Sequence, residues 1–179
     1  MILGCDPSLQ GFGWALVSEG RLVSHQRWHH GPSPCRLTCF KEWFDHQMPE
    51  ETPALVVIEG YAFGARNGRE ALGELGGLLR HALYLWEVPW ITVPPPSLKL
   101  WITGQGRASK AAMRKALVGR LPKDEKLSHD EVDAYALGLL GEAFLQRQLP
   151  TALLGRLDHQ MQDYPPQGAW THEYFFAPH

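Results

Sequence analysis

The first strands of the chain decide its fold, and residues 2–17 read ILGCDPSLQGFGWALV. The apolar run over residues 2–5 predicts a short buried strand that ends at Asp6-Pro7. Two more strands are predicted over residues 12–17 and 22–28, and glycine-containing turns join the three. The chain therefore opens on a hairpin-rich sheet whose first strand ends in a carboxylate.

The following part of the chain alternates strands with helices. Leu55-Val56-Val57-Ile58 is an apolar run of the length expected for a central strand covered on both faces. A further strand is predicted over residues 90–93, and helical spacing is found over residues 37–44, 69–86, 94–103, 109–119 and 128–148. This order predicts an α/β fold in which a mixed sheet is flanked by helices.

The helical pattern lapses from residue 149 onward. Residues 163–179 contain three prolines and five aromatic residues without a usable period. We therefore divide the chain into a domain over residues 1–148 and a C-terminal extension over residues 149–179, which we expect to be irregular or partly disordered.

Composition excludes several classes of protein. Of the 179 residues 44% are hydrophobic, which is enough for a packed core, and the formal net charge is only −2. No apolar run approaches the ~18 residues that a membrane span needs, and the first residues lack a basic leader. The three cysteines are too few and odd in number for a disulfide framework. We expect a cytoplasmic protein without a membrane partner.

Positive charge is concentrated in one window of the chain. Residues 99–126 contain eight basic residues and two acidic ones, a local charge of +6. The basic residues are Lys99, Arg107, Lys110, Arg114, Lys115, Arg120, Lys123 and Lys126. Such a cluster is often a solvated helix face, and it can equally hold a polyanion such as nucleic acid.

Four carboxylates stand where carboxylates are costly or unexplained. Asp6 follows an apolar strand directly, and Glu59 ends the most apolar one, where an unpaired carboxylate costs several kcal/mol. In the last predicted helix, Ser128 and Glu131 have the spacing of a capping box, which gives Glu131 a structural role.

Asp130 lies in the first turn of the same helix and could merely favour the helix dipole, but Asp133 cannot be explained that way. Asp133 is in register with Leu137 and Leu140, so it faces the packed side of the helix, and Asp130 shares that face. The four acids are either members of structural ion pairs or a cluster that binds hard divalent cations, Mg²⁺ or Mn²⁺. Two such ions can clamp a phosphodiester, and the basic window would then hold the polyanion.

Four stretches, in order, resemble the RuvC-type Holliday junction resolvases of the RNase H-like nuclease superfamily. They are the strand, acid and Gly-aromatic turn of residues 2–14, the Glu59 strand and aromatic loop of residues 56–67, the Lys…Thr-Gly-x-Gly-x-Ala-x-Lys string of residues 99–110, and Asp-x-x-Asp-Ala at residues 130–134. Each motif alone is weak, but four in order make chance improbable. The resemblance covers roughly residues 1 to 145.

The resemblance implies a fold, a reaction and a set of site residues. The fold is an RNase H-like mixed five-stranded sheet flanked by helices, and the reaction is paired, metal-dependent nicking of opposed strands in a four-way DNA junction. The implied catalytic residues and ligands of two Mg²⁺ or Mn²⁺ ions are Asp6, Glu59, Asp130 and Asp133. The implied DNA-binding residues are Lys99, Arg107, Lys110, Arg114, Tyr61, Phe63, Arg66 and Asn67.

A homodimer is also implied, with contacts at the helix that contains Gly73, Gly76 and Gly77. Alternatives remain at this stage. Within nucleases the alternative is a broader fork and flap debranching enzyme, as in viral relatives of the family, and a bacterial or a viral source would suit either. A non-catalytic junction-binding protein is a second alternative, but it would not need all four acids. The actin-like sugar kinases and chaperone ATPases open with a similar strand and acid, but they use two lobes where this chain has one. A branch-migration motor is left open as a partner.

Overall fold

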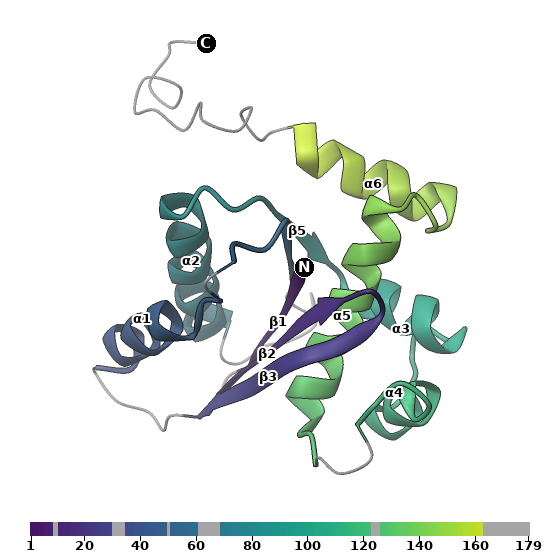
Figure 1. Cartoon of the computed structure of the whole chain (residues 1–179), viewed down its shortest axis with the longest axis horizontal. Helices are drawn as coiled ribbons and strands as arrows, with labels where there is room; N and C mark the ends of the chain where they lie inside the picture. The colour runs from purple at the N-terminus through teal and green to yellow at the C-terminus, as the bar shows by residue number, and fades with distance from the viewer. Residues whose placement is uncertain (9–10, 30–34, 50, 61–68, 123–125, 163–179) are drawn as a thin grey trace.

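The protein was analysed as a computed structural model, which describes residues 1–8, 11–29, 35–49, 51–60, 69–122 and 126–162. Five strands form one sheet in the order β3-β2-β1-β4-β5 (Figure 1). Their bounds are Ile2–Ser8 for β1, Gly11–Ser18 for β2, Arg21–His29 for β3, Leu55–Glu59 for β4 and Trp90–Val93 for β5. The first three strands are antiparallel, while β1, β4 and β5 run parallel to one another. The predicted mixed five-stranded sheet is confirmed.

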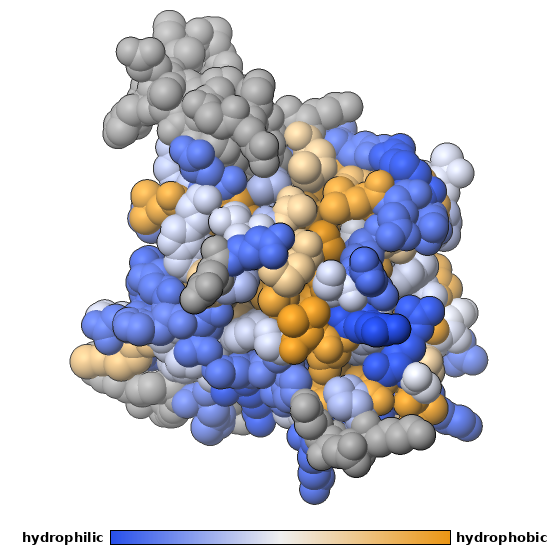
Figure 2. All heavy atoms as spheres, in the orientation of Figure 1, coloured by the Kyte–Doolittle hydropathy of each residue, from blue (hydrophilic) through white to orange (hydrophobic). Residues whose placement is uncertain are grey.

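Helices cover both faces of this sheet. The six in the described part are α1 (Arg36–Gln47), α2 (Arg69–Leu85), α3 (Pro95–Thr103), α4 (Lys110–Leu117), α5 (His129–Leu145) and α6 (Thr151–Gln162). The first two lie on one side of the sheet, and α5 with α3 and α4 lies on the other (Figure 1). Figure 2 shows a hydrophobic band between these two helix layers, with hydrophilic side chains over the helices on either side. None of the helices described is long and apolar enough to cross a membrane.

The first strand is longer than its apolar run. Sequence analysis ends it at Asp6-Pro7, but β1 continues to Ser8 and pairs with β2 over its whole length. Its pairing with β4 ends at Cys5, so Pro7 has a neighbouring strand on one side only. A proline lacks the N–H that a two-sided ladder needs, and it is tolerated where one side is open. Asp6 consequently lies inside a strand and not at its end.

Two separate cores hold the layers together. On one face, α1 and α2 pack aromatic and aliphatic side chains against the alternate residues of β1 and β2, with Phe12 edge-on to Phe40 and Phe44. On the other face, α5 is buried along almost its entire length, because α3, α4 and α6 cover the side that does not touch the sheet. A helix that is apolar on all sides is the expected occupant of such a position.

The helix α5 lies directly on the backbone of β1 and β2. A Cβ atom added to Gly4 would lie 1.9 Å from the carbonyl oxygen of Ala134 and 2.7 Å from the amide nitrogen of Gly138. At the start of the helix, a Cβ on Gly13 would lie 2.6 Å from the carbonyl carbon of Asp130. Only residues without a side chain allow the two backbones to approach so closely, and this contact places the first turn of α5 over the ends of the strands.

The C-terminal extension is partly helical, which corrects the expectation of an irregular segment over residues 149–179. Leu153 and Leu157 of α6 are buried against the α5 core. The Gln160 amide accepts a hydrogen bond from the Thr92 N–H at 2.7 Å and donates one to the Thr92 carbonyl at 3.0 Å. The helix forms because it protects the edge strand β5, whose free backbone groups the sequence pattern does not reveal. Residues 163–179 lie outside the described residues.

Replacing Gly4 by alanine should lower the free energy of unfolding by about 3 kcal/mol, because the new methyl group has no space below the backbone of α5. Gly155→Ala in α6 is the matched control: a Cβ there meets no atom within 4 Å, so the substitution should stabilise the helix by up to ~1 kcal/mol. Urea denaturation of both variants measures the difference. Equal small effects would show that α5 does not depend on this contact.

Candidate functional site

Two of the four predicted acids lie side by side on neighbouring parallel strands. Cys5 of β1 pairs with Ile58 of β4, so Asp6 and Glu59 follow at the same level and point to the α5 face. Each of the two carboxyl groups influences the pKa of the other. Asp6 is the more deeply buried, with 4% of its surface exposed, whereas Glu59 is partly buried.

The other two acids come from the first turns of α5. Ser128 caps the helix by accepting a hydrogen bond from the Glu131 N–H, while the Glu131 carboxylate accepts one from the Ser128 N–H, as the capping-box spacing predicts. Asp130 and Asp133 are both buried under the helix, at 7% and 6% exposure. The structure brings the acids of these three segments near enough for the charges of Glu59, Asp130 and Asp133 to influence Asp6.

Burial and mutual repulsion raise the pKa values of three of these acids. Burial raises the pKa of Asp6 well above its usual range, and the charges of Glu59, Asp133 and Asp130 add to it. Burial also raises the pKa of Glu59, although Asp6 and the ammonium groups of Lys99 and Lys110 oppose the rise. The pKa of Asp133 is raised to about 6, first by burial and then by the charge of Glu59. These groups lack sufficient positive charge around them.

Asp130 differs from the other three acids. Its Oδ2 lies 3.1 Å from Nε of Arg27, and its Oδ1 lies 3.5 Å from Nζ of Lys110. Within the described residues, no lysine or arginine forms an ion pair with Asp6, Glu59 or Asp133. Of the two alternatives, structural ion pairs are found at Asp130, and a cation-binding role stays a prediction for the remaining acids.

The acids fit a divalent cation by chemistry and charge. Carboxylate oxygens are the donors that Mg²⁺ and Mn²⁺ prefer, and three acids with raised pKa values are stabilised by any added cation. In the described part of the chain, no three Asp, Glu, His or Cys side chains already converge as they do around a bound ion. Binding of a cation would therefore require these oxygens to move.

The predicted basic residues have different surroundings. Lys99 in α3 and Lys110 at the start of α4 both lie close enough to the acids to lower the pKa of Glu59 and Asp133. Arg107 is exposed in the connection between these helices. Arg114, in contrast, donates a hydrogen bond to the Leu127 carbonyl and so holds the segment that leads into α5. The predicted loop residues Tyr61, Phe63, Arg66 and Asn67 lie outside the described residues.

Sequence analysis missed two residues that hold the first turn of α5. His25 and Arg27 are alternate residues of β3, and they bond to Glu131 and Asp130 respectively. The His25 Nδ1 lies 2.7 Å from the Glu131 carboxylate, and hydrogen bonds from Ser128 and His25 outweigh burial and lower the pKa of Glu131. Their alternation on one face of a strand was the available signal, but it does not show which helix would lie over that face.

Comparisons with known proteins agree with this geometry. The chain is 26% identical over 151 residues to "Crossover junction endodeoxyribonuclease RuvC" of Mycolicibacterium vanbaalenii, which covers 77% of the chain and 76% of that protein. The enzyme of the same name from Hydrogenovibrio crunogenus is 26% identical over 152 residues, covering 80% and 88%. No protein-family model matches the chain.

Solved structures show the same fold. Thermus thermophilus RuvC superposes with a TM-score of 0.69 at 20% identity, over 82% of this chain and 95% of that one. This chain is similar to RuvC in sequence and in fold. The fowlpox virus resolvase, solved with a Holliday junction, superposes with a TM-score of 0.53 at 15% identity, over 79% of this chain and 97% of that one. The predicted resemblance to RuvC and the RNase H-like fold are confirmed.

The raised pKa of Asp133 predicts how the stability of this RuvC relative depends on pH in EDTA. The native carboxyl titrates at about 6 and the unfolded one near 3.8, so the native state keeps a proton that the unfolded chain has lost. Stability should therefore fall as pH rises through this window, by about 2–3 kcal/mol for this group. Asp133→Asn should be the more stable protein at pH 7.5, and its advantage should vanish near pH 4.

Urea denaturation of both proteins across this pH range measures the advantage. A difference between the two proteins that does not change with pH would contradict the assignment of the raised pKa to Asp133. The comparison between the variants cancels the titration of every group that Asp133 does not influence.

Proposed function

We propose that the protein is a cytoplasmic, structure-selective DNA endonuclease that resolves Holliday junctions by metal-dependent nicking of opposed strands. The observation that carries this proposal is the group of Asp6, Glu59 and Asp133, whose pKa values are raised first of all by burial and, for Asp6 and Asp133, by the charges of the neighbouring acids. We propose the substrate from the similarity to proteins named RuvC, which match about four fifths of the chain.

Asp6, Glu59, Asp130 and Asp133 are the residues that would hold the two Mg²⁺ or Mn²⁺ ions. Bound there, the ions would supply an activated water and neutralise the leaving oxygen of a phosphodiester. Asp6 would be central among the ligands, because the charges of Glu59 and of both acids of α5 all influence it. Carboxyl groups with a raised pKa must lose their protons before they can serve as ligands.

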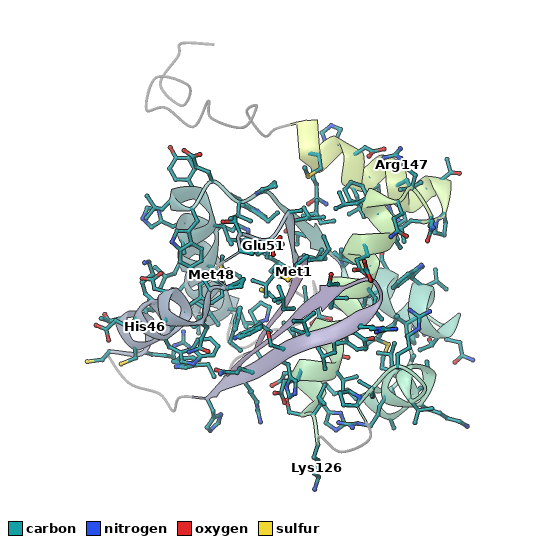
Figure 3. The ribbon with its side chains drawn as sticks, viewed as in Figure 1. Met1, His46, Met48, Glu51, Lys126 and Arg147 are labelled. Carbon is teal, nitrogen blue, oxygen red and sulfur yellow. The ribbon has the colours of Figure 1, made fainter. Side chains whose placement is uncertain are left out.

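Basic residues around the acids would hold the DNA backbone. Lys99 and Lys110 come from α3 and α4, and their charges reach the acids, so a phosphate bound by them would lie beside the cluster. Arg107 is exposed nearby, and Lys126 extends into solvent where the chain enters α5 (Figure 3). We also propose DNA contacts for Arg114 and for Tyr61, Phe63, Arg66 and Asn67, which follow Glu59 in the sequence.

Paired nicking requires two active sites, and we propose that α2 joins two copies of the chain. Gly73 and Gly77 of this helix are exposed, and a Cβ on either would meet no atom within 4 Å. A helix surface without side chains allows a second helix to approach closely. Two sites related by a two-fold axis match the symmetry of a four-way junction.

Glu59→Gln and Asp6→Asn should each slow junction nicking at least about 10³-fold, because loss of a cation ligand removes several kcal/mol of charge stabilisation. Binding of the junction should persist or strengthen, since a negative charge is lost. The assay compares a four-way junction, a three-way fork and an RNA–DNA hybrid with Mg²⁺ or Mn²⁺. Asp45→Asn, at an exposed carboxylate of α1, is the control and should retain full activity.

Preference for the four-way junction distinguishes a resolvase from a broader debranching enzyme, and cleavage of the hybrid would indicate a ribonuclease. Nicking that survives in Glu59→Gln would refute the role of the acidic cluster.

Light scattering at micromolar concentration should give a particle of twice the 20.2 kDa of one chain. Gly77→Arg should shift this particle toward the monomer, because the exposed position then carries a bulky charged side chain. The equivalent change at Gly155 in α6 should leave the particle unchanged. A wild-type protein that stays monomeric even with junction DNA would rule out paired nicking by a dimer.

A further inference from the structure

Arg27 is the residue of β3 that reaches the acidic cluster. It pairs in the sheet with Gly13 of β2, and its guanidinium passes over Gly11, whose Cβ, if present, would lie 3.5 Å from Nε and 3.8 Å from Nη2. These two glycines leave a strip of the sheet without side chains. The guanidinium lies along this strip and ends 3.1 Å from the Oδ2 atom of Asp130.

Lys110 approaches the same carboxylate from another element. Its Nζ lies 3.5 Å from Oδ1, so β3 and α4 each supply a cation to a different oxygen of Asp130. The carboxylate is buried, with its side chain 9% exposed, whereas the side chains of Arg27 and Lys110 are 40% and 54% exposed. A ligand arriving from solvent therefore meets the two cations before it meets the acid.

Neutralising Asp130 would leave Arg27 without its partner. A divalent cation bound by the acids takes up the negative charge of the carboxylate and repels a guanidinium beside it. A phosphate group then becomes the better partner for Arg27, because a guanidinium donates two parallel hydrogen bonds to phosphate oxygens. The exposure of Arg27 allows this exchange without opening the core.

We propose that Arg27 is a phosphate-contacting residue, which Asp130 holds in the free protein and which binds a phosphate of the DNA backbone once Asp130 is neutralised. The inference rests on the proposed nuclease function, and it adds a DNA contact on the β3 side of the acids to the contacts expected from α3 and α4. The charge of Asp130 thereby determines whether Arg27 contacts the DNA.

Asp130→Asn reproduces the neutral state without any metal, so the test is made in EDTA. Binding of a synthetic four-way DNA junction is measured against salt for the wild type, Arg27→Gln, Asp130→Asn and the double variant. Each phosphate contact contributes about 0.9 to the slope of log K against log salt. Arg27→Gln should reduce the slope by about 0.9 in the Asp130→Asn background and by less than half of that in the wild-type background.

Two further variants complete the design in the Asp130→Asn background. Arg27→Lys keeps the charge and should restore the slope. Arg21→Gln removes the same charge from the same strand, about 20 Å away by the rise of an extended strand, and should change nothing. Thermal unfolding of each protein confirms that it is folded.

The results separate this inference from the function on which it rests. Equal slopes for Asp130→Asn and the double variant would overturn the inference. The proposed function would stand in that case, provided that the wild type binds the junction. An equal loss of slope on Arg27→Gln in both backgrounds would also overturn it, because Arg27 would then not be held by Asp130. The same loss of slope in Arg21→Gln would overturn it as well, because Arg27 would then act only through net charge. A wild-type protein that binds no junction would overturn both.

Discussion

The contact between the backbones of α5 and β1 is the constraint on which the site depends. With Gly4 against Ala134 and Gly138, the helix axis approaches the sheet more closely than side chains would allow. The start of α5 rests on Gly13, the residue of β2 that pairs with Asp6, and so Asp130 and Asp133 are brought close to Asp6 and to Glu59 on the neighbouring strand. A helix set back by one layer of side chains would leave these carboxylates too far apart to act on one another.

Such an approach gathers negative charge in a buried place, and the surrounding structure limits the resulting repulsion in two ways. The ammonium groups of Lys99 and Lys110 lower the pKa of Glu59, and ion pairs compensate Asp130. The capping box and His25 fix the helix start, so the acids of α5 cannot move away by fraying. The raised pKa values of Asp6, Glu59 and Asp133 show that this compensation is incomplete.

Sequence reasoning located the four acids because each breaks a local rule. A carboxylate at the end of the Leu55–Glu59 strand and another on the apolar side of a helix are visible without any contact map. The strands themselves were predicted from the same apolar runs. The role of Arg27 could not be found this way, because it depends on which strand residue lies under the first turn of α5. The helix α6 could not be found either, because it forms against an edge strand that needs covering. The extension of β1 past Pro7 likewise depends on where β4 stops pairing.

The difference between Asp130 and its neighbours has a consequence for how the cluster works. Asp130 is already compensated by Arg27 and Lys110, whereas burial raises the pKa of Asp6 and Glu59. In the proposed nuclease, cation binding would therefore be opposed by two different costs, deprotonation at the strands and ion-pair exchange at the helix. The second cost would be recovered when Arg27 and Lys110 meet DNA phosphates, so bound DNA would favour metal binding by the acids. Linkage requires that metal would then favour DNA binding in equal measure.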